Sequence, residues 1–369
     1  MDTELEQLVD TVWTTSLERM MKKEITPIRP SLGDFIDLYI PQTRALLLME
    51  TNPSAIRTVY DSAYSSANRN TFGIMKKLGM PADYFWKFEY WPRDRAYETL
   101  RKVITKVFTT MMNRNKEGGL ELESVEIEPV RFTIFFKECA ECAGVAASKP
   151  ICYYHAATFA GILASLLNRE MDSYETKCNG KGDDSCVFII GKRDDDEIKQ
   201  KVTEYLSPIH IETTFDDRLS CSLQGNPIRS VGNMVDIGYY NLMFMSMLLP
   251  DADTASKANL EMGTAYGIKL APVVMRYYAD NSIEVIKKYY NQMHHLDVKT
   301  IEITGDEVNI VLGECAEAAT TFKRKELLNF LSGELQGLVS TITTKQFALK
   351  GSTFEDSCLR IKLAPNNQV

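Results

Sequence analysis

The chain has 369 residues, with 42 basic and 50 acidic side chains that give a formal net charge of −8. This length exceeds what one hydrophobic core usually organises, so two medium-sized domains are expected. The acidic balance and the lack of a basic stripe argue against nucleic acid as a direct partner, and no run of about 20 apolar residues is present to form a membrane-spanning helix.

The first predicted element is a helix over residues 1–24, where apolar residues recur at helical spacing. The internal repeat described below does not require this helix. Two interpretations stay open: it mediates dimerisation or binds a partner, or it packs on its own domain. Residues 1–30 are therefore treated as an N-terminal helical extension.

Residues 84–91 contain six aromatic side chains in eight positions. Aromatic side chains with few polar groups can line an apolar ligand pocket. They can equally form an exposed docking patch or part of the core. The pocket interpretation names Phe85, Trp86, Phe88, Tyr90 and Trp91.

Five of the eight cysteines fall within residues 139–186. The first two, Cys139 and Cys142, form a C-x-x-C pair. With cysteines further along the chain they could hold an iron–sulfur cluster, form a redox-sensing disulfide, or simply fill a packed strand. His155 is a further candidate ligand, although such a histidine more often caps or packs.

The remaining cysteines have the spacing of a tetrahedral zinc site. Two short strands over residues 171–178 and 186–190, joined by a glycine-bearing turn, form a hairpin that presents three of the ligands. The fourth precedes an apolar helix, so a metal would fasten that helix to the hairpin. Four protein ligands leave no open position, which favours a structural ion; ordinary cysteines are the alternative. The ligand set is Cys152, Glu175, Cys178 and Cys186.

A charged run over residues 193–206 is expected to be a linker, because a stretch of this kind is usually solvated. No positively charged start followed by an apolar signal segment is visible, so the thiols are expected to stay reduced and the protein to be cytoplasmic. The expected limits are 31–192 for a first domain with the metal site and 207–366 for a second.

The second domain repeats the first. Residues 32–49 resemble 231–248, and the motif E-C-A-E-C-A resembles E-C-A-E-A-A later in the chain. Gly73 corresponds to Gly267, as expected where helices pack closely at a small residue. From Cys152 onward the two copies align without gaps at an offset of 172.

The duplication is asymmetric at the metal ligands. The equivalent positions carry Arg324, Phe347 and Lys350, and only Cys358 is retained. The second copy is therefore expected to bind no zinc. The copies either divide their labour, or the duplication merely builds an intramolecular pseudo-dimer with a larger core.

Residues 130–190 resemble the 4-vinyl reductase (4VR) domain, through E-C-A-E-C-A-G, C-Y-Y-H-A-A-T-F-A-G and Y-E-T-K-C-N-G-K-G-D-D-S-C. Relatives of that domain include sensor domains of phenol- and toluene-responsive activators and, more distantly, Bet-type subunits of the TRAPP vesicle-tethering complex. The resemblance implies an α+β fold, here two tandem 4VR-like domains, each an antiparallel sheet packed with helices. It also implies zinc at the four residues named above.

The leading functional hypothesis is a sensor or regulatory protein that binds a small apolar or aromatic ligand and acts through a protein partner. Phenol itself is a poor candidate, because the sensors hold it with an upstream histidine and this chain has no histidine before His155. The alternatives are a non-catalytic scaffold and, behind it, a reductase or iron–sulfur protein. No nucleotide loop, nucleophile elbow or paired histidine motif supports catalysis. A homodimer is compatible with these hypotheses.

Overall fold

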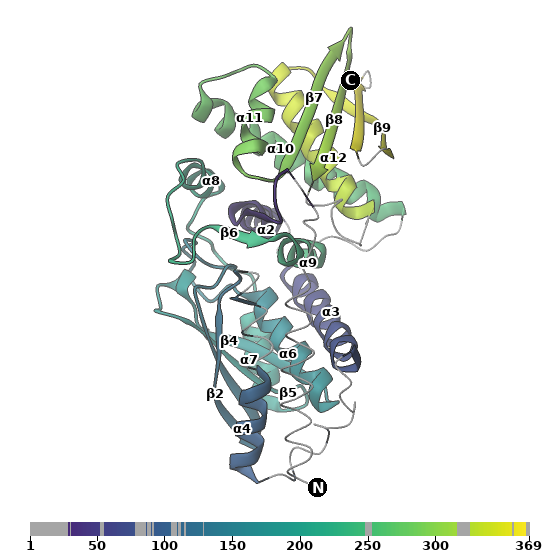
Figure 1. Ribbon diagram of the computed structural model, residues 1–369. Coiled ribbons are helices and arrows are strands. Elements are labelled where there is room, and N and C mark those ends of the chain that lie inside the picture. The colour runs from purple at the N-terminus through teal and green to yellow at the C-terminus, as the bar shows by residue number, and fades with distance from the viewer. Residues whose placement is uncertain are drawn as a thin grey trace. The chain divides into compact units, whose positions relative to one another are not determined.

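The computed structural model describes residues 29, 31–51, 55–77, 86, 90, 92–104, 109, 112–113, 116–127, 129–247, 253–315, 325–355 and 358–366. The chain divides into two compact units, and each contains a four-stranded antiparallel sheet with helices (Figure 1). This confirms the α+β architecture of two tandem domains. The helix expected over residues 1–24 lies outside the described residues.

Unit 1 carries the sheet with strand order β2-β3-β5-β4. Alternating burial along β3 places one face of this sheet against the helices. The elements of unit 1 are α3 (Ala55–Lys77), α4 (Arg93–Val103), β2 (Gly119–Ile127), β3 (Val130–Lys137), α6 (Tyr153–Leu167), β4 (Met171–Lys177), η3 (Asn179–Lys181), β5 (Cys186–Lys192) and α7 (Asp196–Tyr205).

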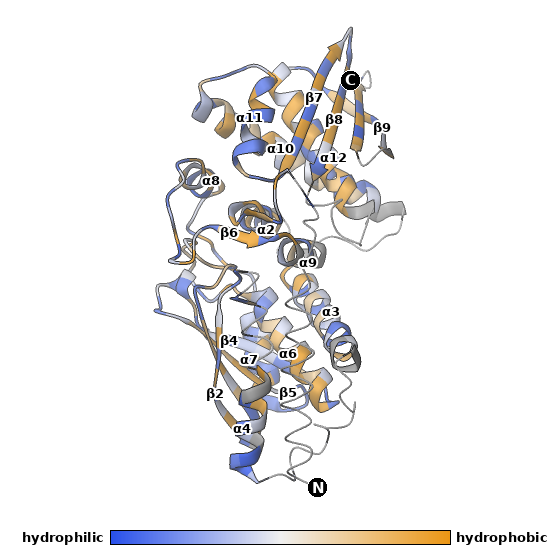
Figure 2. Ribbon diagram, viewed as in Figure 1, coloured by the Kyte–Doolittle hydropathy of each residue, from blue (hydrophilic) through white to orange (hydrophobic). Residues whose placement is uncertain are grey.

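Unit 2 carries the sheet with strand order β7-β8-β10-β9. Hydrophobic and hydrophilic residues alternate along β7, as Figure 2 shows. Its elements are β1 (Phe35–Asp37), α2 (Tyr39–Thr51), α8 (Phe215–Leu223), β6 (Met234–Asp236), α9 (Ile237–Met247), α10 (Asp253–Tyr278), α11 (Glu284–Gln292), β7 (Leu296–Thr304), β8 (Glu307–Cys315), α12 (Lys325–Thr343), β9 (Phe347–Glu355) and β10 (Cys358–Pro365).

The two sheets repeat one topology, as the internal duplication predicts. Their strand orders match position by position. Helices α6 and α12 begin at Tyr153 and Lys325, which are 172 residues apart. The copies differ at the end of the fourth element, because β9 continues to Glu355 where the first copy has the turn that contains η3. The second copy therefore has a plain hairpin at the position of the metal-ligand turn.

Each repeat contributes its opening segment to the other unit. Residues 26–51, from the first repeat, belong to unit 2, and residues 228–231, from the second, belong to unit 1. The Arg29 guanidinium donates to the carbonyls of His294 and His295 at 2.8 and 3.0 Å. Arg229 donates in the same way to the carbonyls of Lys116 and Glu138, at 2.7 and 3.0 Å.

A serine follows each of these arginines and makes an equivalent contact. The backbone N–H and hydroxyl of Ser31 donate to the Glu314 carboxylate, and those of Ser230 donate to the Glu138 carboxylate. Glu138 and Glu314 begin the two repeated E-C-A-E motifs. The motif therefore receives the opening segment, which we call the exchanged arm: residues 29–31 in one repeat and 229–230 in the other.

The arms continue into a two-stranded ribbon within unit 2. Strands β1 and β6 are antiparallel, and Ile36 pairs with Val235, its counterpart in the repeat. Pairing of equivalent residues at the centre of the register gives the ribbon a local two-fold symmetry. Both central side chains are buried.

Unit 2 has a charged pair in its core. The Arg44 guanidinium lies 2.5 Å from the Glu334 carboxylate, and both side chains are fully buried. Tyr290 donates its hydroxyl to the other Glu334 oxygen at 2.6 Å. The guanidinium carbon lies 4.7 Å from the ring centre of Phe244 and 4.9 Å from that of Phe330. Aromatic faces and one carboxylate thus surround the cation.

Helices α10 and α12 pack closely through glycines. A Cβ atom added at Gly267 would lie 2.0 Å from the Glu334 carbonyl oxygen, and one added at Gly333 would lie 2.1 Å from the Leu260 carbonyl oxygen. The expected role of Gly267 in close helix packing is confirmed. The same expectation is wrong for Gly73, where an added Cβ meets nothing within 4 Å. In unit 1 the close approach is made by Gly161 of α6.

Alanine substitutions at the two equivalent glycines should therefore have opposite effects. We expect Gly267→Ala to lower the free energy of unfolding of unit 2 by about 3 kcal/mol, because the new methyl group meets backbone atoms that cannot move aside. Gly73→Ala should stabilise α3 by about 1 kcal/mol through helix propensity alone. Hydrogen exchange of α10 and α3 measures both effects, and equal effects would contradict the packing difference.

The segment expected to be a charged linker contains helix α7. Asp195 caps its N-terminus by accepting from the backbone N–H groups of Glu197 and Ile198. Ile198 and Val202 are buried, and α7 packs on β4. The domain limits given above stay a prediction about folding units. Among the described helices, none is long and apolar enough to cross a bilayer.

Candidate metal centre

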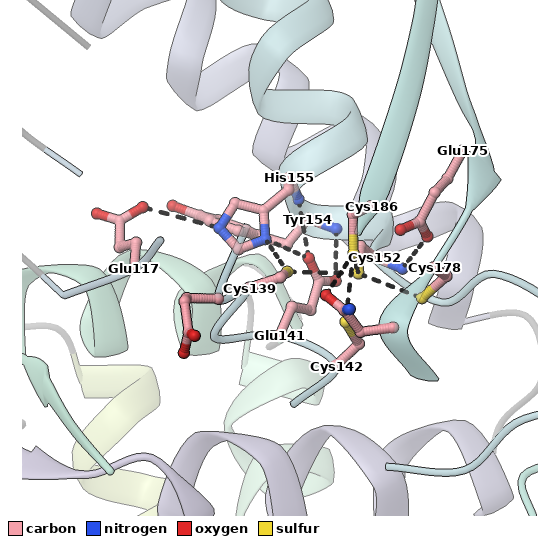
Figure 3. Close-up of polar contacts among 12 residues, drawn as sticks. Glu117, Cys139, Glu141, Cys142, Cys152, Tyr154, His155, Glu175, Cys178 and Cys186 are labelled. Carbon is pink, nitrogen blue, oxygen red and sulfur yellow. Dashed lines mark hydrogen bonds and ion pairs between the residues drawn. The ribbon is translucent and has the colours of Figure 1, made fainter. Parts of the chain in front are cut away.

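Five cysteine side chains converge in unit 1 (Figure 3). Two come from the turn after β3, one precedes α6, one ends the connection from β4, and one begins β5. All five are at most 1% exposed, and none forms a disulfide. They are Cys139, Cys142, Cys152, Cys178 and Cys186.

The distances between the sulfur atoms match those around one metal ion. Cys152 Sγ lies 3.7 Å from that of Cys186 and 3.8 Å from that of Cys178. Zinc–sulfur bonds of about 2.3 Å in a tetrahedron place the sulfurs about 3.8 Å apart. Glu175 brings a carboxylate oxygen within 4.8 Å of these three sulfurs. The four side chains predicted as ligands therefore lie together.

The turn between β4 and β5 holds its two cysteines in place by local hydrogen bonds. The Asp183 carboxylate accepts from the backbone N–H of Cys178 at 2.9 Å, and the Cys178 carbonyl accepts from the N–H of Lys181 at 2.9 Å. Gly182 has a φ of +96°, which favours glycine. The sequence N-G-K-G-D thus curls the chain so that Cys178 and Cys186 face the same point.

Glu175 is a buried carboxylate with one oxygen satisfied. Its Oε2 accepts from the backbone N–H of Cys152 at 2.9 Å. Its Oε1 has no hydrogen-bond partner among the described residues. Burial, followed by the nearby Cys178 and Cys139 sulfurs, holds the pKa of this carboxyl well above its usual range. A cation at the cysteines would satisfy the remaining oxygen and offset this cost.

Cys139 and Cys142 join the same cluster. Cys139 Sγ lies 3.5 Å from that of Cys152, and Cys142 Sγ lies 3.4 Å from that of Cys186. Cys139, Cys142, Cys152 and Cys186 form a second set of four ligand atoms within 4.8 Å of one another. Metal or redox chemistry at Cys139 and Cys142 stays a prediction, and their position beside the first set is now fixed.

His155 lies beside the cluster and outside both four-ligand sets. Its Nδ1 is 2.9 Å from the Glu141 carboxylate and 3.6 Å from Cys139 Sγ, and its Nε2 is 3.8 Å from Glu117. Burial opposes protonation, but Cys139 and the two carboxylates hold the pKa of His155 well above its ordinary value. The histidine therefore bridges the cluster and two acidic side chains.

Glu141 is a residue that sequence reasoning missed. Its carboxylate accepts from the backbone N–H groups of Tyr154 and His155 in the first turn of α6. A carboxylate at this position satisfies unpaired donors and complements the helix dipole. The signal was present, because E-C-A-E-C-A places Glu141 between the two cysteines.

The aromatic segment is described only in part. Trp86 is 38% exposed and Tyr90 is 83% exposed. Phe85, Phe88 and Trp91 lie outside the described residues. The ligand pocket assigned to these five residues stays a prediction.

The second repeat places different side chains at the equivalent positions. Phe347 is buried, and Lys350 lines a groove of about 730 Å³ on the sheet of unit 2, together with Arg360 and Lys362. Both groups of candidate metal ligands found among the described residues lie in the first repeat. A lysine at this position disfavours a bound dication.

Residues 132–192 match the family model for the vinyl-4-reductase domain, the same 4VR domain that the sequence resembles. The chain contains a 4VR domain. This span covers β3 to β5 and thus all the residues of the metal centre. It also agrees with the resemblance drawn from the sequence over residues 130–190.

Two uncharacterized proteins of Methanocaldococcus jannaschii are 32% identical to the chain, over 91 and 95 residues. These segments cover 24% and 25% of the chain, and the chain spans only 51% and 58% of the length of these relatives.

Similar solved structures include the phenol-responsive sensory domain of the transcription activator PoxR with phenol, at 13% identity and a TM-score of 0.32, covering 44% of this chain and 81% of that one. A vinyl-4-reductase family protein from M. jannaschii has 20% identity and a TM-score of 0.23, covering 33% and 73%. A trafficking protein particle complex subunit 3 from Naegleria fowleri, covalently bound to palmitic acid, has 16% identity and a TM-score of 0.28, covering 52% and 96%.

Proposed function

We propose that the protein is a non-catalytic regulatory protein whose 4VR domain is held together by structural zinc and binds a small apolar or aromatic molecule. The observation that carries the metal part is a complete buried set of four ligands at the junction of α6 with the β4–β5 hairpin. With Cys152, Glu175, Cys178 and Cys186 all bound, zinc has no open position for a substrate. The ion acts as a fastener. The reduced thiols that it requires fit a cytoplasmic location.

The ligand part rests on the 4VR domain and on the aromatic segment. The 4VR resemblance implies a ligand-binding module, and residues 84–91 supply six aromatic side chains in the half that carries the metal set. In this proposal the segment contacts the ligand, and binding changes what a protein partner recognises. The exposure of Trp86 and Tyr90 favours a second candidate function, a scaffold on which the segment docks a partner directly.

Thermal unfolding of the metal-loaded full chain distinguishes the two candidates. The probes are toluene, naphthalene and indole. A probe present at 100 times its dissociation constant adds about 2.7 kcal/mol to the free energy of unfolding, which corresponds to a rise in Tm of roughly 5–10 °C in a unit of this size. Trp86→Ala should abolish the rise. Tyr277→Ala should retain it, because Tyr277 is an exposed aromatic residue of the second repeat.

Two results would contradict the sensor proposal. If no probe raises the Tm, the apolar ligand site is wrong and the scaffold is favoured. If Trp86→Ala responds as the wild type does, the aromatic segment does not contact the ligand.

A further inference from the structure

The two sets of candidate ligands share an edge. Cys152 and Cys186 belong to both sets, and their sulfurs are 3.7 Å apart. One set is completed by Cys139 and Cys142, and the other by Glu175 and Cys178. Figure 3 shows the sulfurs of the first pair on one side of Cys152 and the side chains of the second pair on the other.

The measured separations fit two tetrahedra joined along that edge. Cys139 lies 3.5 Å from one shared sulfur, and Cys142 lies 3.4 Å from the other. On the opposite side, Cys178 lies 3.8 Å from the shared Cys152 sulfur. All of these values are close to the edge of about 3.8 Å that zinc–sulfur bonds of about 2.3 Å produce.

We propose that the site holds two divalent metal ions bridged by the thiolates of Cys152 and Cys186. Cys139 and Cys142 complete the coordination of one ion, and Glu175 and Cys178 complete that of the other. Six protein ligands then supply four donors to each ion, because a thiolate sulfur has enough lone pairs to bind two metals. The inference builds on the proposed structural zinc and adds a second ion to it.

A single ion would leave strong ligands unused beside it. If one ion occupied the set with Glu175, then Cys139 and Cys142 would remain as buried thiols in contact with bound sulfurs. If it occupied the four-cysteine set, the Glu175 carboxylate would remain buried with one oxygen unsatisfied and Cys178 would remain unused. A buried charge without a partner is costly, whereas a nearby dication deprotonates a thiol and binds it. Two ions use every ligand.

The charges and donor types agree with this assignment. Two dications carry +4, and five thiolates with one carboxylate carry −6, so the centre has a net charge of −2. His155 can offset part of this charge, because its Nδ1 lies 3.6 Å from Cys139 Sγ. Thiolate-rich tetrahedral sites suit zinc. The cysteines of a four-iron cluster each bind a different iron, which would hold their sulfurs farther apart than observed.

The test begins with metal analysis of the full chain purified with zinc and without chelators. We expect two zinc ions per wild-type chain and one in Cys142→Ser, which keeps the set of Glu175 and Cys178. Loss of a bridging ligand in Cys186→Ser should remove both ions. Cys221→Ser should retain two, because Cys221 lies in α8 of unit 2, outside both sets.

Cobalt titration of the metal-free wild-type chain gives a readout that does not depend on any variant. The sulfur-to-cobalt absorption should rise to a breakpoint at two equivalents. Between the first and second equivalents the magnetic moment per cobalt should fall, because thiolate bridges couple the two ions antiferromagnetically. This measurement decides the question even if Cys142→Ser does not fold.

The other outcomes separate this inference from the proposed function. One zinc in both the wild type and Cys142→Ser, with a cobalt breakpoint at one equivalent, overturns the bridged pair and leaves the structural zinc standing. No bound metal in the wild type overturns both. Iron with acid-labile sulfide overturns the bridged pair and the structural zinc, and identifies a redox cluster instead.

Discussion

Cys152→Ser should lose bound metal and unfold unit 1. Cys152 precedes the first residue of α6, so it fastens the helix to the β4–β5 hairpin. Structural zinc contributes on the order of 10 kcal/mol of folding free energy, which is comparable to the net stability of a whole domain, about 5–15 kcal/mol. Metal content and hydrogen exchange of α6 and β5 measure the two effects. Chelation of the wild-type chain should reproduce them.

The matched control is Cys315→Ser in the second repeat. Cys315 is also buried, and it corresponds to Cys139 in the repeat. Its replacement buries a hydroxyl group outside both ligand sets, at a cost of about 1–3 kcal/mol, and it should leave the metal content unchanged. A Cys152→Ser chain that keeps its metal and its protection from exchange would show that the cluster does not hold α6.

Arg44→Met should lower the free energy of unfolding of unit 2 by about 3–5 kcal/mol. The substitution leaves the Glu334 carboxylate buried without its charged partner, and that uncompensated charge is the main cost. The double variant Arg44→Met/Glu334→Leu should recover most of the loss, because an apolar pair of similar volume can replace a buried ion pair. A double variant no more stable than the single one would contradict this account.

Hydrogen exchange is the suitable measurement for this pair. All three tryptophans precede residue 92 and lie outside the segments of unit 2, so tryptophan fluorescence does not report on unit 2 directly. Peptides from α10 and α12 should lose protection in Arg44→Met, while those from α6 keep it. The aromatic rings around Arg44 make Met a suitable replacement, since its thioether contacts them favourably.

The sequence was sufficient to predict the hairpin and its ligand set. Cysteines at fixed spacing around a turn with two glycines constrain the local backbone, so Cys178 and Cys186 could be paired without a structure. The contact of Cys139 and Cys142 with the same sulfurs could not be derived in this way. It depends on how the turn after β3 packs against the N-terminus of α6, which is a tertiary contact between segments with no local spacing rule.

The glycines show the same limit. Gly73 and Gly267 occupy equivalent positions in the repeat, yet only Gly267 meets the backbone of a neighbouring helix. Helix propensity and alignment treat the two alike, because neither contains the distance between helices. The buried Arg44–Glu334 pair was also beyond reach, since its partners are 290 residues apart in the chain.

The exchanged arms have a consequence for how such a chain could arise and be divided. A polypeptide with a single repeat would carry an arm and a receiving glutamate, and the receiver would be filled by the arm of another molecule. Joining two repeats in one gene replaces that concentration-dependent encounter with a tether, which supplies an effective concentration on the order of millimolar. A fragment containing only residues 207–366 would lack Arg29 and Ser31, so cutting the gene at its repeat boundary would leave the second half without the arm that completes it.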